Sequence, residues 1–312
     1  MSIKQIVNTN PILKIILEKW RYNRRVDLSK LSIEERTKRL MDTYERRVGY
    51  RMDINNPKTF TEKIQWYKLF YKGDINLERL VDKYLFKQYI REKLGDGYTI
   101  PLIGAWESVK DFKRDWDKLP EEFCLKSTVQ SDGIFIKFVH NKSSIDFKDL
   151  SKEVRRWLLP KNTLLNSYCR AYYNAVPRLI AEEYMENVSN QLYDYKFFCF
   201  DGQPYVIYAA MEHFDSEDYP ITFYDLDWNE TGVRYGHHRI KDLPRPKHLD
   251  EMIEISRKLS KGFPFIRVDF FDTEDKLYVA ELTMYPGGGY VKYEPESFNE
   301  KMGQMFKLPI NS

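Results

Sequence analysis

The sequence has few of the residues that build disulfide frameworks and zinc centres, with only three cysteines and five histidines among 312 residues. The cysteines are odd in number, far apart and set among apolar residues, which predicts reduced core thiols at Cys124, Cys169 and Cys199. The spacing and the companion ligands of a zinc site are missing around His213, His237 and His238. Neither a disulfide framework nor a zinc centre is therefore expected.

Glycine is also scarce, at 14 residues, and no glycine-rich P-loop with its Lys-Ser/Thr pair is present. The sequence has no convincing Ser-His-Asp or Cys-His series, no internal repeat and no low-complexity linker. Catalysis by a side-chain nucleophile of these kinds is therefore not expected.

An excess of one charge is lacking over the whole chain, because 50 Lys/Arg against 47 Asp/Glu give a net charge of only +3. No chain-wide polyanionic partner is implied, and no nucleic acid is expected. The basic excess is local, since residues 1–50 carry twelve Lys/Arg against six Asp/Glu. A basic amphipathic arm of this kind either packs on the domain or lies on an anionic membrane surface.

Long apolar runs are missing as well. The apolar residues between Met1 and Trp20 are interrupted by charges and by Pro11, and no small-residue cleavage site follows. Neither export nor a membrane span is predicted. We expect a cytoplasmic protein, and the basic arm leaves open a peripheral contact at the inner face of the membrane.

The most informative stretch, residues 263–290, is typical of a β-hairpin, because two apolar, β-branched and aromatic runs flank a polar turn. Side chains alternate along a strand, so Arg267 and Asp269 share one face. With the turn centred on Asp275, Asp269 and Glu281 lie opposite each other with Cβ atoms about 5 Å apart. Two facing carboxylates need a cation between them, and all-oxygen ligation with room for phosphate favours Mg²⁺ or Mn²⁺.

The rest of the chain mixes helical and extended segments, which indicates an α+β protein. Helices are predicted over residues 11–25, 32–47, 59–70, 80–94, 147–159 and 249–261. Strands are predicted over residues 98–106, 123–126, 134–139, 178–185, 193–200, 205–208 and 222–228, several of them in an antiparallel meander. Ser32 as an N-cap, and Thr59 with Glu62 at capping-box spacing, mark two of the helix starts.

A candidate phosphate-binding loop follows the strand that ends at Lys126. The loop is small and polar, contains Gly133, and leads into a return strand. Such a unit can fold over polyphosphate by using backbone N–H groups and one fixed cation. Most strand-turn-strand units bind nothing, so this segment gains meaning only together with the hairpin.

Several sequence motifs, which occur in the same order over roughly residues 49–306, resemble those of the ATP-grasp ligases, including the D-alanine:D-alanine ligases. In detail the sequence is similar to the TupA-like ATP-grasp proteins of teichuronopeptide and capsular polysaccharide synthesis. The phrases that carry this narrower resemblance are Asn56-Pro57-Lys58-Thr59-Phe60 with Glu62-Lys63-Ile64-Gln65-Trp66, Val81-Asp82-Lys83-Tyr84, Ile180-Ala181-Glu182-Glu183-Tyr184, Asp194-Tyr195-Lys196-Phe197-Phe198-Cys199-Phe200, Phe223-Tyr224-Asp225-Leu226-Asp227-Trp228, and Glu281-Leu282-Thr283 with Tyr285-Pro286-Gly287.

The resemblance implies an α+β ATP-grasp fold, in which two α+β lobes with antiparallel sheets grip ATP. We expect a basic helical arm over residues 1–48 and a helical region before the ATP-grasp unit over residues 49–120. The small lobe is expected over residues 121–185, and the large lobe with the metal site over residues 186–312.

The resemblance also implies a nucleotide site. Lys83 and Lys126 would hold the ATP phosphates as point charges, beneath the loop that contains Gly133. Backbone groups of Glu183 and Met185 would meet the adenine edge. Ribose hydroxyls would go to Asp194, and the cofactor site would also include Lys196.

The remaining implied roles belong to the hairpin. Magnesium ligands would be Asp269, Glu281 and Thr283, the last standing where other ATP-grasp enzymes usually have Asn. Catalytic roles would fall to Lys126 and to Arg267, which would neutralise the acyl phosphate and the tetrahedral intermediate. Backbone N–H groups of Gly287 and Gly288 would approach the acceptor substrate.

These parts imply an ATP-dependent carboxylate-amine ligase that works through an acyl phosphate, with ATP and Mg²⁺ or Mn²⁺ as cofactors. The family suggests an acceptor that is a uronic acid of a surface glycan or its precursor, joined to an amino acid or another amine. It also suggests that the basic N-terminal arm contacts either the membrane or the capsule-synthesis machinery. The sequence departs from relatives at Ser127-Thr128-Val129-Gln130, before Ser131-Asp132-Gly133. A competing hypothesis is a metal-dependent glycosyltransferase that uses Asp225-Leu226-Asp227.

Overall fold

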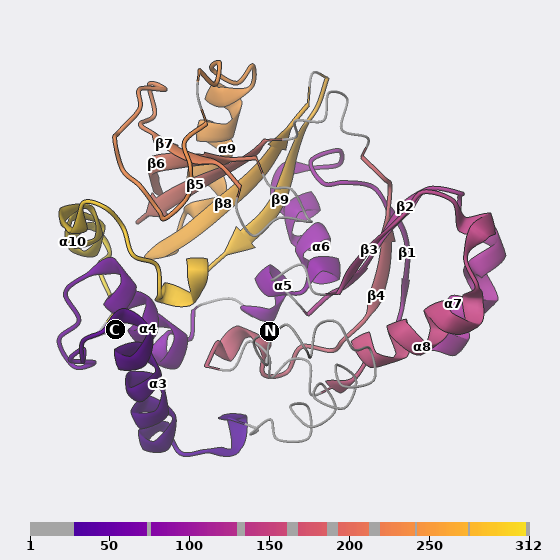
Figure 1. Ribbon diagram of the computed structural model, residues 1–312, viewed down its shortest axis with the longest axis horizontal. Helices are drawn as coiled ribbons and strands as arrows, with labels where there is room; N and C mark the ends of the chain where they lie inside the picture. The colour runs from indigo at the N-terminus through magenta and orange to yellow at the C-terminus, as the bar shows by residue number, and fades with distance from the viewer. Residues whose placement is uncertain are drawn as a thin grey trace, which may run out of the picture.

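The computed structural model has two antiparallel sheets with helices packed around them (Figure 1). It describes residues 28–73, 76–129, 135–160, 168–185, 193–211, 219–240, 242–273 and 275–309. The predicted helix over residues 11–25 therefore lies outside the described residues. None of the helices in the described ranges has the length and apolar character that crossing a bilayer requires.

The larger sheet has five strands in the order β7-β6-β5-β8-β9. Its strands are β5 (Asp194–Phe200), β6 (Gln203–Ala210), β7 (Ile221–Tyr224), β8 (Phe265–Asp272) and β9 (Leu277–Thr283). Neighbouring strands are antiparallel throughout, as the predicted meander requires. This sheet carries the hairpin of facing acids at one edge.

The smaller sheet has four strands in the order β1-β4-β2-β3, also antiparallel. Its strands are β1 (Leu102–Trp106), β2 (Phe123–Ser127), β3 (Ile136–Val139) and β4 (Leu179–Glu182). Strand β4 lies between β1 and β2, so the end of the predicted hinge strand is central in the sheet.

Helices cover both sheets. The α-helices are α3 (Ile33–Val48), α4 (Phe60–Phe70), α5 (Glu78–Val81), α6 (Lys83–Leu94), α7 (Val109–Asp115), α8 (Phe147–Trp157), α9 (Leu249–Ser260) and α10 (Glu296–Met305). The 3-10 helices are η1 (Leu28–Lys30), η2 (Trp116–Lys118), η3 (Lys142–Ser144), η5 (Arg170–Tyr172) and η6 (Pro286–Gly289). In Figure 1, α5 and α6 lie between the two sheets, and α7 and α8 flank the smaller one.

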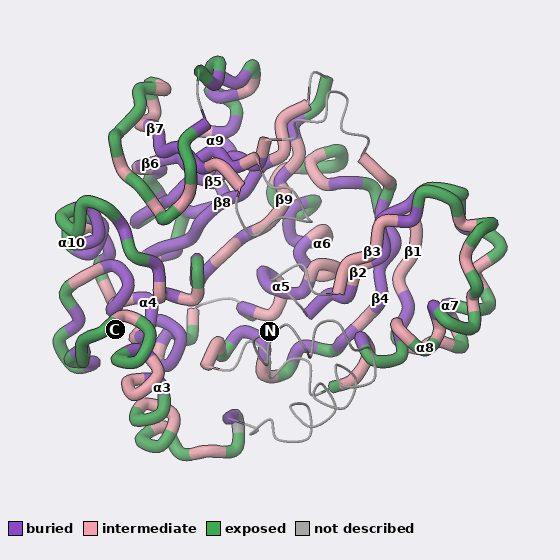
Figure 2. Tube along the Cα trace, viewed as in Figure 1, coloured by how far each residue is buried: buried purple, intermediate pink, exposed green. Residues whose placement is uncertain are grey.

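Two hydrophobic clusters follow this division. The first joins the larger sheet with α4, α5, α6, α9 and α10, and we call this unit the large lobe. The second joins the smaller sheet with α7 and α8, and we call it the small lobe. Figure 2 shows β5, β6, β7 and most of β8 buried and the edge strand β9 largely intermediate, whereas the outer turns of α7 and α8 are exposed. Strand β1 and helix α7 pack in the core of the small lobe. The domain boundaries proposed from the sequence remain predictions.

The two predicted helix caps are confirmed. Ser32 caps α3 by accepting a hydrogen bond from the Glu35 amide, and α3 ends at Gly49 in the left-handed conformation. Thr59 and Glu62 form the predicted capping box at the start of α4. These starts are readable because a cap is a local interaction between residues three positions apart.

Some predicted elements are shorter or divided. The predicted helix over residues 80–94 is two helices, because Asp82 leaves the helical conformation and caps α6 by accepting from the amides of Tyr84 and Leu85. Strand β1 starts only after Pro101, which has no N–H to donate to a ladder. Strand β7 ends before Asp225, whose carboxylate accepts hydrogen bonds from the following turn.

The register of the hairpin is confirmed where it matters for the site. Asp269 pairs directly with Glu281, and Arg267 pairs with Thr283. Between Asp269 and Phe270 the register shifts by one residue, because β9 has an extra residue at Ala280. The strand register predicted from a turn centred on Asp275 is therefore correct for Asp269 and Glu281. For Phe270 to Asp272 it is wrong by one residue.

Candidate active site

A cleft of about 620 Å³ lies between the two sheets and receives side chains from both lobes. Its charged lining residues are Lys83, Lys87, Lys126, Glu182, Asp194, Lys196, Arg267, Asp269 and Glu281. Its other lining residues include Ile100, Ile136, Phe138, Tyr208, Tyr219, Tyr235, Phe271, Val279 and Gly287. Eight of the thirteen sequence-predicted site residues thus line one cleft, although they come from distant parts of the chain.

The two predicted phosphate lysines enter the cleft from different elements. Lys83 opens α6 directly after the Asp82 cap, and its backbone N–H donates to the Thr128 carbonyl at 3.2 Å. Thr128 is itself tied to Arg178 through backbone and hydroxyl hydrogen bonds. Burial lowers the pKa of Lys83 despite the nearby Glu281 carboxylate. The altered residues after Lys126 therefore anchor the base of the loop to the helix that presents Lys83.

A buried ion-pair bridge holds the second lysine. Glu182, at the end of β4, contacts Lys126 Nζ at 2.6 Å with Oε2 and Lys87 Nζ at 2.6 Å with Oε1. The Glu182 side chain is only 6% exposed. Burial opposes its charge, but the two ammonium groups prevail and lower its pKa to about 2. Burial likewise opposes the charge of Lys126, and the carboxylate raises its pKa.

We expect Glu182→Gln to destabilise the fold by about 3–5 kcal/mol at neutral pH, because two partly buried lysines lose their shared, buried counter-charge. The folded-state pKa of about 2 lies below the unfolded value of 4.5. The stabilisation by Glu182 is therefore present above pH 4.5 and is lost as the pH falls toward 2. Urea unfolding of the wild type and of Glu182→Gln across this pH range measures the stabilisation.

The matched control is Glu254→Gln on α9, where the carboxylate pairs with Arg257 and is 71% exposed. An exposed pair contributes at most about 1 kcal/mol, so this change is expected to be nearly neutral. Equal stabilities of Glu182→Gln and the wild type at pH 7 would contradict the bridge.

A second chain of charges runs along the larger sheet. Arg267 Nε donates to Asp269 Oδ1 at 2.7 Å and Nη2 donates to Oδ2 at 2.5 Å, a fork-shaped pair. Lys196 Nζ lies 3.6 Å from Asp269 Oδ2 and forms an ion pair with Asp194. Burial acts against the charge of Arg267, but Asp269 raises its pKa well above the usual value. Four of the predicted residues are thus in direct contact.

The predicted metal pair fits an oxygen-ligated cation. Asp269 is 1% exposed and faces Glu281 across the hairpin. Among the described residues the Glu281 side chain has no hydrogen-bond or ion-pair partner, although its charge acts on Lys83, Lys126 and Arg267. No group of three or more His, Cys, Asp or Glu able to hold a metal occurs among the described residues. Two carboxylates with water and phosphate oxygens suit Mg²⁺, which is bound through one or two carboxylates plus substrate phosphates.

Thr283 and the predicted acceptor loop stand next to this pair. The Thr283 hydroxyl accepts from Arg267 Nη2 at 3.1 Å. Gly287 lines the cleft, whereas the carbonyl of Gly288 accepts hydrogen bonds from Gln65 and Lys68 of α4. Both glycines have left-handed φ values, of 55° and 59°.

The residues predicted to contact adenine follow the end of β4. Glu183 is exposed, and its backbone N–H donates to the Pro101 carbonyl at 3.0 Å. Met185 is half-buried at the end of the described range, and Gly133 lies outside the described residues. Their roles toward adenine and phosphate remain predictions.

Asp225 and Asp227 do not form a metal pair. The Asp225 carboxylate accepts from the amides of Asp227 and Asn229, at 3.0 and 2.8 Å, and from the Asn229 side chain. Those bonds cap the turn after β7, away from the lining of the cleft. The metal site that the glycosyltransferase hypothesis requires at Asp225 and Asp227 is therefore not supported.

Sequence reasoning missed Lys87 and three tyrosines of the cleft. Lys87 stands four residues after Lys83 on α6, and this helical spacing could have indicated a shared face. Tyr208, Tyr219 and Tyr235 come from separate segments, and no local pattern relates them. Tyr208 accepts from Arg267 Nη1 at 3.3 Å, and its ring lies 6.3 Å from that of Tyr235.

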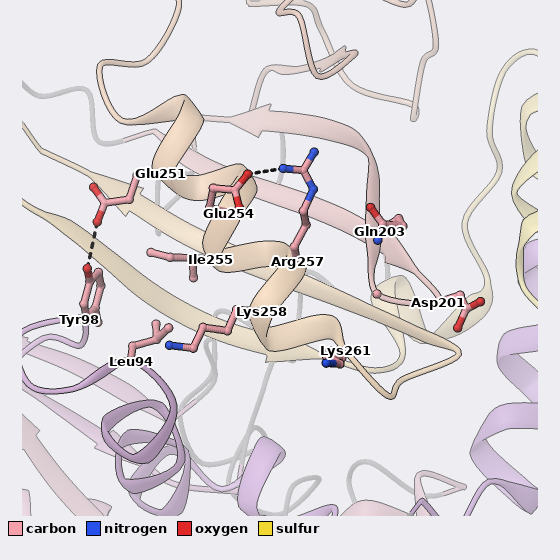
Figure 3. Close-up of a pocket in the computed structure, with 11 residues that line it drawn as sticks. Leu94, Tyr98, Asp201, Gln203, Glu251, Glu254, Ile255, Arg257, Lys258 and Lys261 are labelled. Atoms are coloured by element: carbon pink, nitrogen blue, oxygen red, sulfur yellow. Dashed lines mark hydrogen bonds and ion pairs between the residues drawn. The ribbon is translucent and has the colours of Figure 1, made fainter.

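A second cavity, of about 720 Å³, lies on the outer face of the large lobe beside α9 (Figure 3). Three acids there, Asp201, Glu251 and Glu254, are matched by Arg257, Lys258 and Lys261. Figure 3 shows two of the acids already bonded, Glu251 to Tyr98 and Glu254 to Arg257. This balanced, open surface lacks converging cations, so the cleft between the sheets is the better candidate site.

Comparison with solved structures finds D-alanine–D-alanine ligases from Helicobacter pylori and Bacillus anthracis. Both have a TM-score of 0.41, with 14% and 17% identity over 73% and 72% of this chain and 61% and 64% of theirs. A phosphoribosylamine–glycine ligase from Thermotoga maritima has a TM-score of 0.39 and 9% identity, over 67% of this chain and 48% of its own. The chain thus matches less than two thirds of the length of these proteins.

No curated protein matches the sequence. The family model for TupA-like ATP-grasp proteins matches residues 62–307, which include both sheets and every described residue that lines the cleft. Since that match covers most of the chain, the protein belongs to the TupA-like ATP-grasp family, as the phrases in its sequence predicted.

Proposed function

We propose that this protein is an ATP-dependent carboxylate-amine ligase that releases ADP and phosphate and forms an amide bond. The observation that carries the proposal is the cleft between the lobes, where five cationic side chains meet the facing pair Asp269 and Glu281. Cations in that number suit a polyphosphate, and the acids suit the metal ion that accompanies it.

The nucleotide would lie across the cleft with its base in the apolar part. Ile136 and Phe138 of β3 and Val279 of β9 line that part from opposite lobes. Glu182 and Lys126 lie beside it, so the triphosphate would begin at Lys126 and continue toward Lys83. Asp194, paired with Lys196, remains our proposed ribose contact.

Asp269 and Glu281 would hold Mg²⁺ or Mn²⁺, which when bound offsets the repulsion between phosphate oxygens and an attacking anion. Lys83 and Lys126 would orient the phosphates as fixed charges. Arg267, held in place by Asp269 and Thr283, would direct its charge to the transferred group.

The reaction joins two steps. A substrate carboxylate oxygen attacks the γ-phosphorus of ATP, the bond to the β,γ-bridging oxygen breaks, and an acyl phosphate forms beside ADP. An amine then attacks the acyl carbon, phosphate leaves with the C–O bonding electrons, and the amine loses a proton. Arg267 would stabilise the tetrahedral intermediate between these events.

The acceptor is proposed to be a uronic acid of a surface polysaccharide or its precursor, joined to an amino acid or another amine. The family supports this choice, and so does the group of tyrosines at the cleft, Tyr208, Tyr219 and Tyr235. Rings with a polar hydroxyl suit a ligand that has both an apolar face and hydroxyl groups. Action in the cytoplasm, with the basic arm of residues 1–48 contacting either the membrane surface or the capsule-synthesis machinery, is part of this proposal.

A nucleotide-product assay tests the function. The protein is mixed with ATP, MgCl₂, D-glucuronate or D-galacturonate, and each common amino acid in turn, and products are identified by chromatography and mass spectrometry. We expect ADP, phosphate and an amide only when acid and amine are both present. Consumption of UDP-glucuronate without ATP would instead identify a transferase, and ATP-independent amide formation would refute the ligase mechanism.

A further inference from the structure

Helix α4 makes polar contacts with three separate parts of the large lobe. Lys63 Nζ donates to the carbonyls of Gly303 and Phe306, at 2.7 and 2.8 Å, and so closes the end of α10. The Tyr67 hydroxyl donates to the Phe265 carbonyl on β8 at 3.1 Å. Two further polar residues of its buried face, Gln65 and Lys68, reach the glycine loop η6.

Gln65 and Lys68 converge on one carbonyl of this loop. Gln65 Nε2 donates to the carbonyls of Gly288 and Gly289, at 3.1 and 2.6 Å. Lys68 Nζ donates to the same Gly288 carbonyl and to Gln65 Oε1, the latter at 2.9 Å. The two side chains therefore form one connected clamp, with a cation at its centre.

The clamp is buried, and a buried cation is costly. Gln65 is 0% and Lys68 3% exposed, and among the described residues no carboxylate forms an ion pair with Lys68. Burial lowers the pKa of Lys68 to about 8. An apolar residue would fill the same space at lower cost, which indicates that the hydrogen bond to the loop carbonyl is what the ammonium supplies.

The loop needs such a support. Gly287, Gly288 and Gly289 all have left-handed φ values, of 55°, 59° and 67°. Side chains are excluded, because a Cβ on Gly287 would lie 2.2 Å from Val291 and one on Gly289 would lie 2.5 Å from Gln65. Three successive glycines lose much conformational entropy when ordered, so contacts from outside the loop must fix them.

The clamp also reaches the cleft. Gly287, the first glycine of the loop, lines the cleft together with Arg267 and Tyr235. On the other side, the ring of Tyr290 lies between Lys68 and Arg47, each 4.5 Å from its centroid. Helices α3 and α4 thus brace the loop from behind while its front faces the cleft.

We propose that Gln65 and Lys68 are positioning residues that hold the glycine loop in the conformation that binds the acceptor. The inference rests on the proposed function, since it assumes that the acceptor binds beside Gly287. It assigns to α4 a role in acceptor affinity, while nucleotide affinity belongs to the lysines of the cleft.

The test compares two lysines of the same helix. In Lys68→Met the clamp is lost, whereas in the matched control Lys63→Met a lysine that bonds only the end of α10 is lost. With the acid and amine that give the fastest ADP release in the wild type, we expect Lys68→Met to raise the acceptor KM about tenfold or more, with the KM for ATP within about twofold. Lys63→Met should leave both KM values unchanged.

Gln65→Leu provides a second variant, which removes two donors without removing the charge, and it should raise the acceptor KM in the same direction. The inference is overturned if Lys68→Met leaves the acceptor KM at the wild-type value, or if it raises both KM values equally. Melting temperatures show whether each variant is folded at the assay temperature.

Hydrogen exchange of the free protein gives a readout that needs no substrate. We expect Lys68→Met to speed amide exchange in residues 286–290 about tenfold or more, and Lys63→Met to speed it only near residues 303–306. Unchanged exchange in residues 286–290 would refute the clamp, whatever the activity. If exchange behaves as expected but the wild type ligates no acid and amine, the proposed function fails and the role in acceptor binding fails with it, while the clamp stands.

Discussion

Glu281→Gln is expected to lower turnover by a factor on the order of 10³ and to leave the fold intact. Activity should be lost because the variant keeps the shape of the side chain but removes one of two facing charges that would hold the metal. The fold should be kept because the Glu281 side chain lines the cleft and has no hydrogen-bond or ion-pair partner among the described residues. The measurement is ADP release with saturating substrates, at a series of Mg²⁺ concentrations, beside a thermal melt.

Asp275→Asn is the control for this change. Asp275 is an exposed acid at the turn of the same hairpin, so the substitution is chemically equivalent but far from the cleft. It should leave turnover and the Mg²⁺ dependence unchanged. Retained turnover in Glu281→Gln at ordinary Mg²⁺ would refute the assignment of Glu281 as a metal ligand.

Arg267→Lys is expected to reduce turnover by a factor on the order of 10² to 10³, although the charge is kept. The guanidinium forms a fork with Asp269 and also bonds Tyr208 and Thr283, and an ammonium cannot make these bonds in the same directions. Arg267→Met should lose about 10³ to 10⁵, as when an arginine that stabilises a phosphoryl-transfer transition state is removed. Single-turnover measurements of ATP cleavage locate the loss in the chemical step.

Arg257→Lys serves as the control, since that arginine lies beside the outer cavity of Figure 3 and pairs with an exposed glutamate. Its turnover should equal that of the wild type. Because Arg267→Met leaves the buried Asp269 without its main partner, its melting temperature must be measured alongside activity. If Arg267→Lys binds ATP much more weakly but turns over normally at saturating ATP, then Arg267 acts in nucleotide binding. It would then not stabilise the group that is transferred.

The parts of the structure that could be predicted from the sequence are those set by local spacing. Thr59 and Glu62 are three residues apart, and the capping box they form is present. Arg267, Asp269 and Glu281 belong to one hairpin, in which a period of two and the position of the turn determine which side chains face each other. The family resemblance added Lys83 and Lys126, which no spacing links to the hairpin.

What could not be predicted depends on contacts between distant segments. Glu182 lies between Lys87 and Lys126 because β4 pairs between β1 and β2, and that strand order is not visible in local patterns. Glu183 was expected to face the nucleotide through its backbone, but its buried neighbour Glu182 carries the charge that enters the cleft. The extra residue at Ala280 likewise follows from pairing between strands, which composition alone does not reveal.

The separate hydrophobic clusters of the two lobes have a consequence for cooperativity. Each lobe keeps its own packed core, so the smaller one can open by itself without exposing the core of the larger one. A nucleotide bound in the cleft as proposed would contact both, and its binding free energy would favour only the state in which both are folded. The substrate would thus convert two loosely linked folding units into one cooperative molecule.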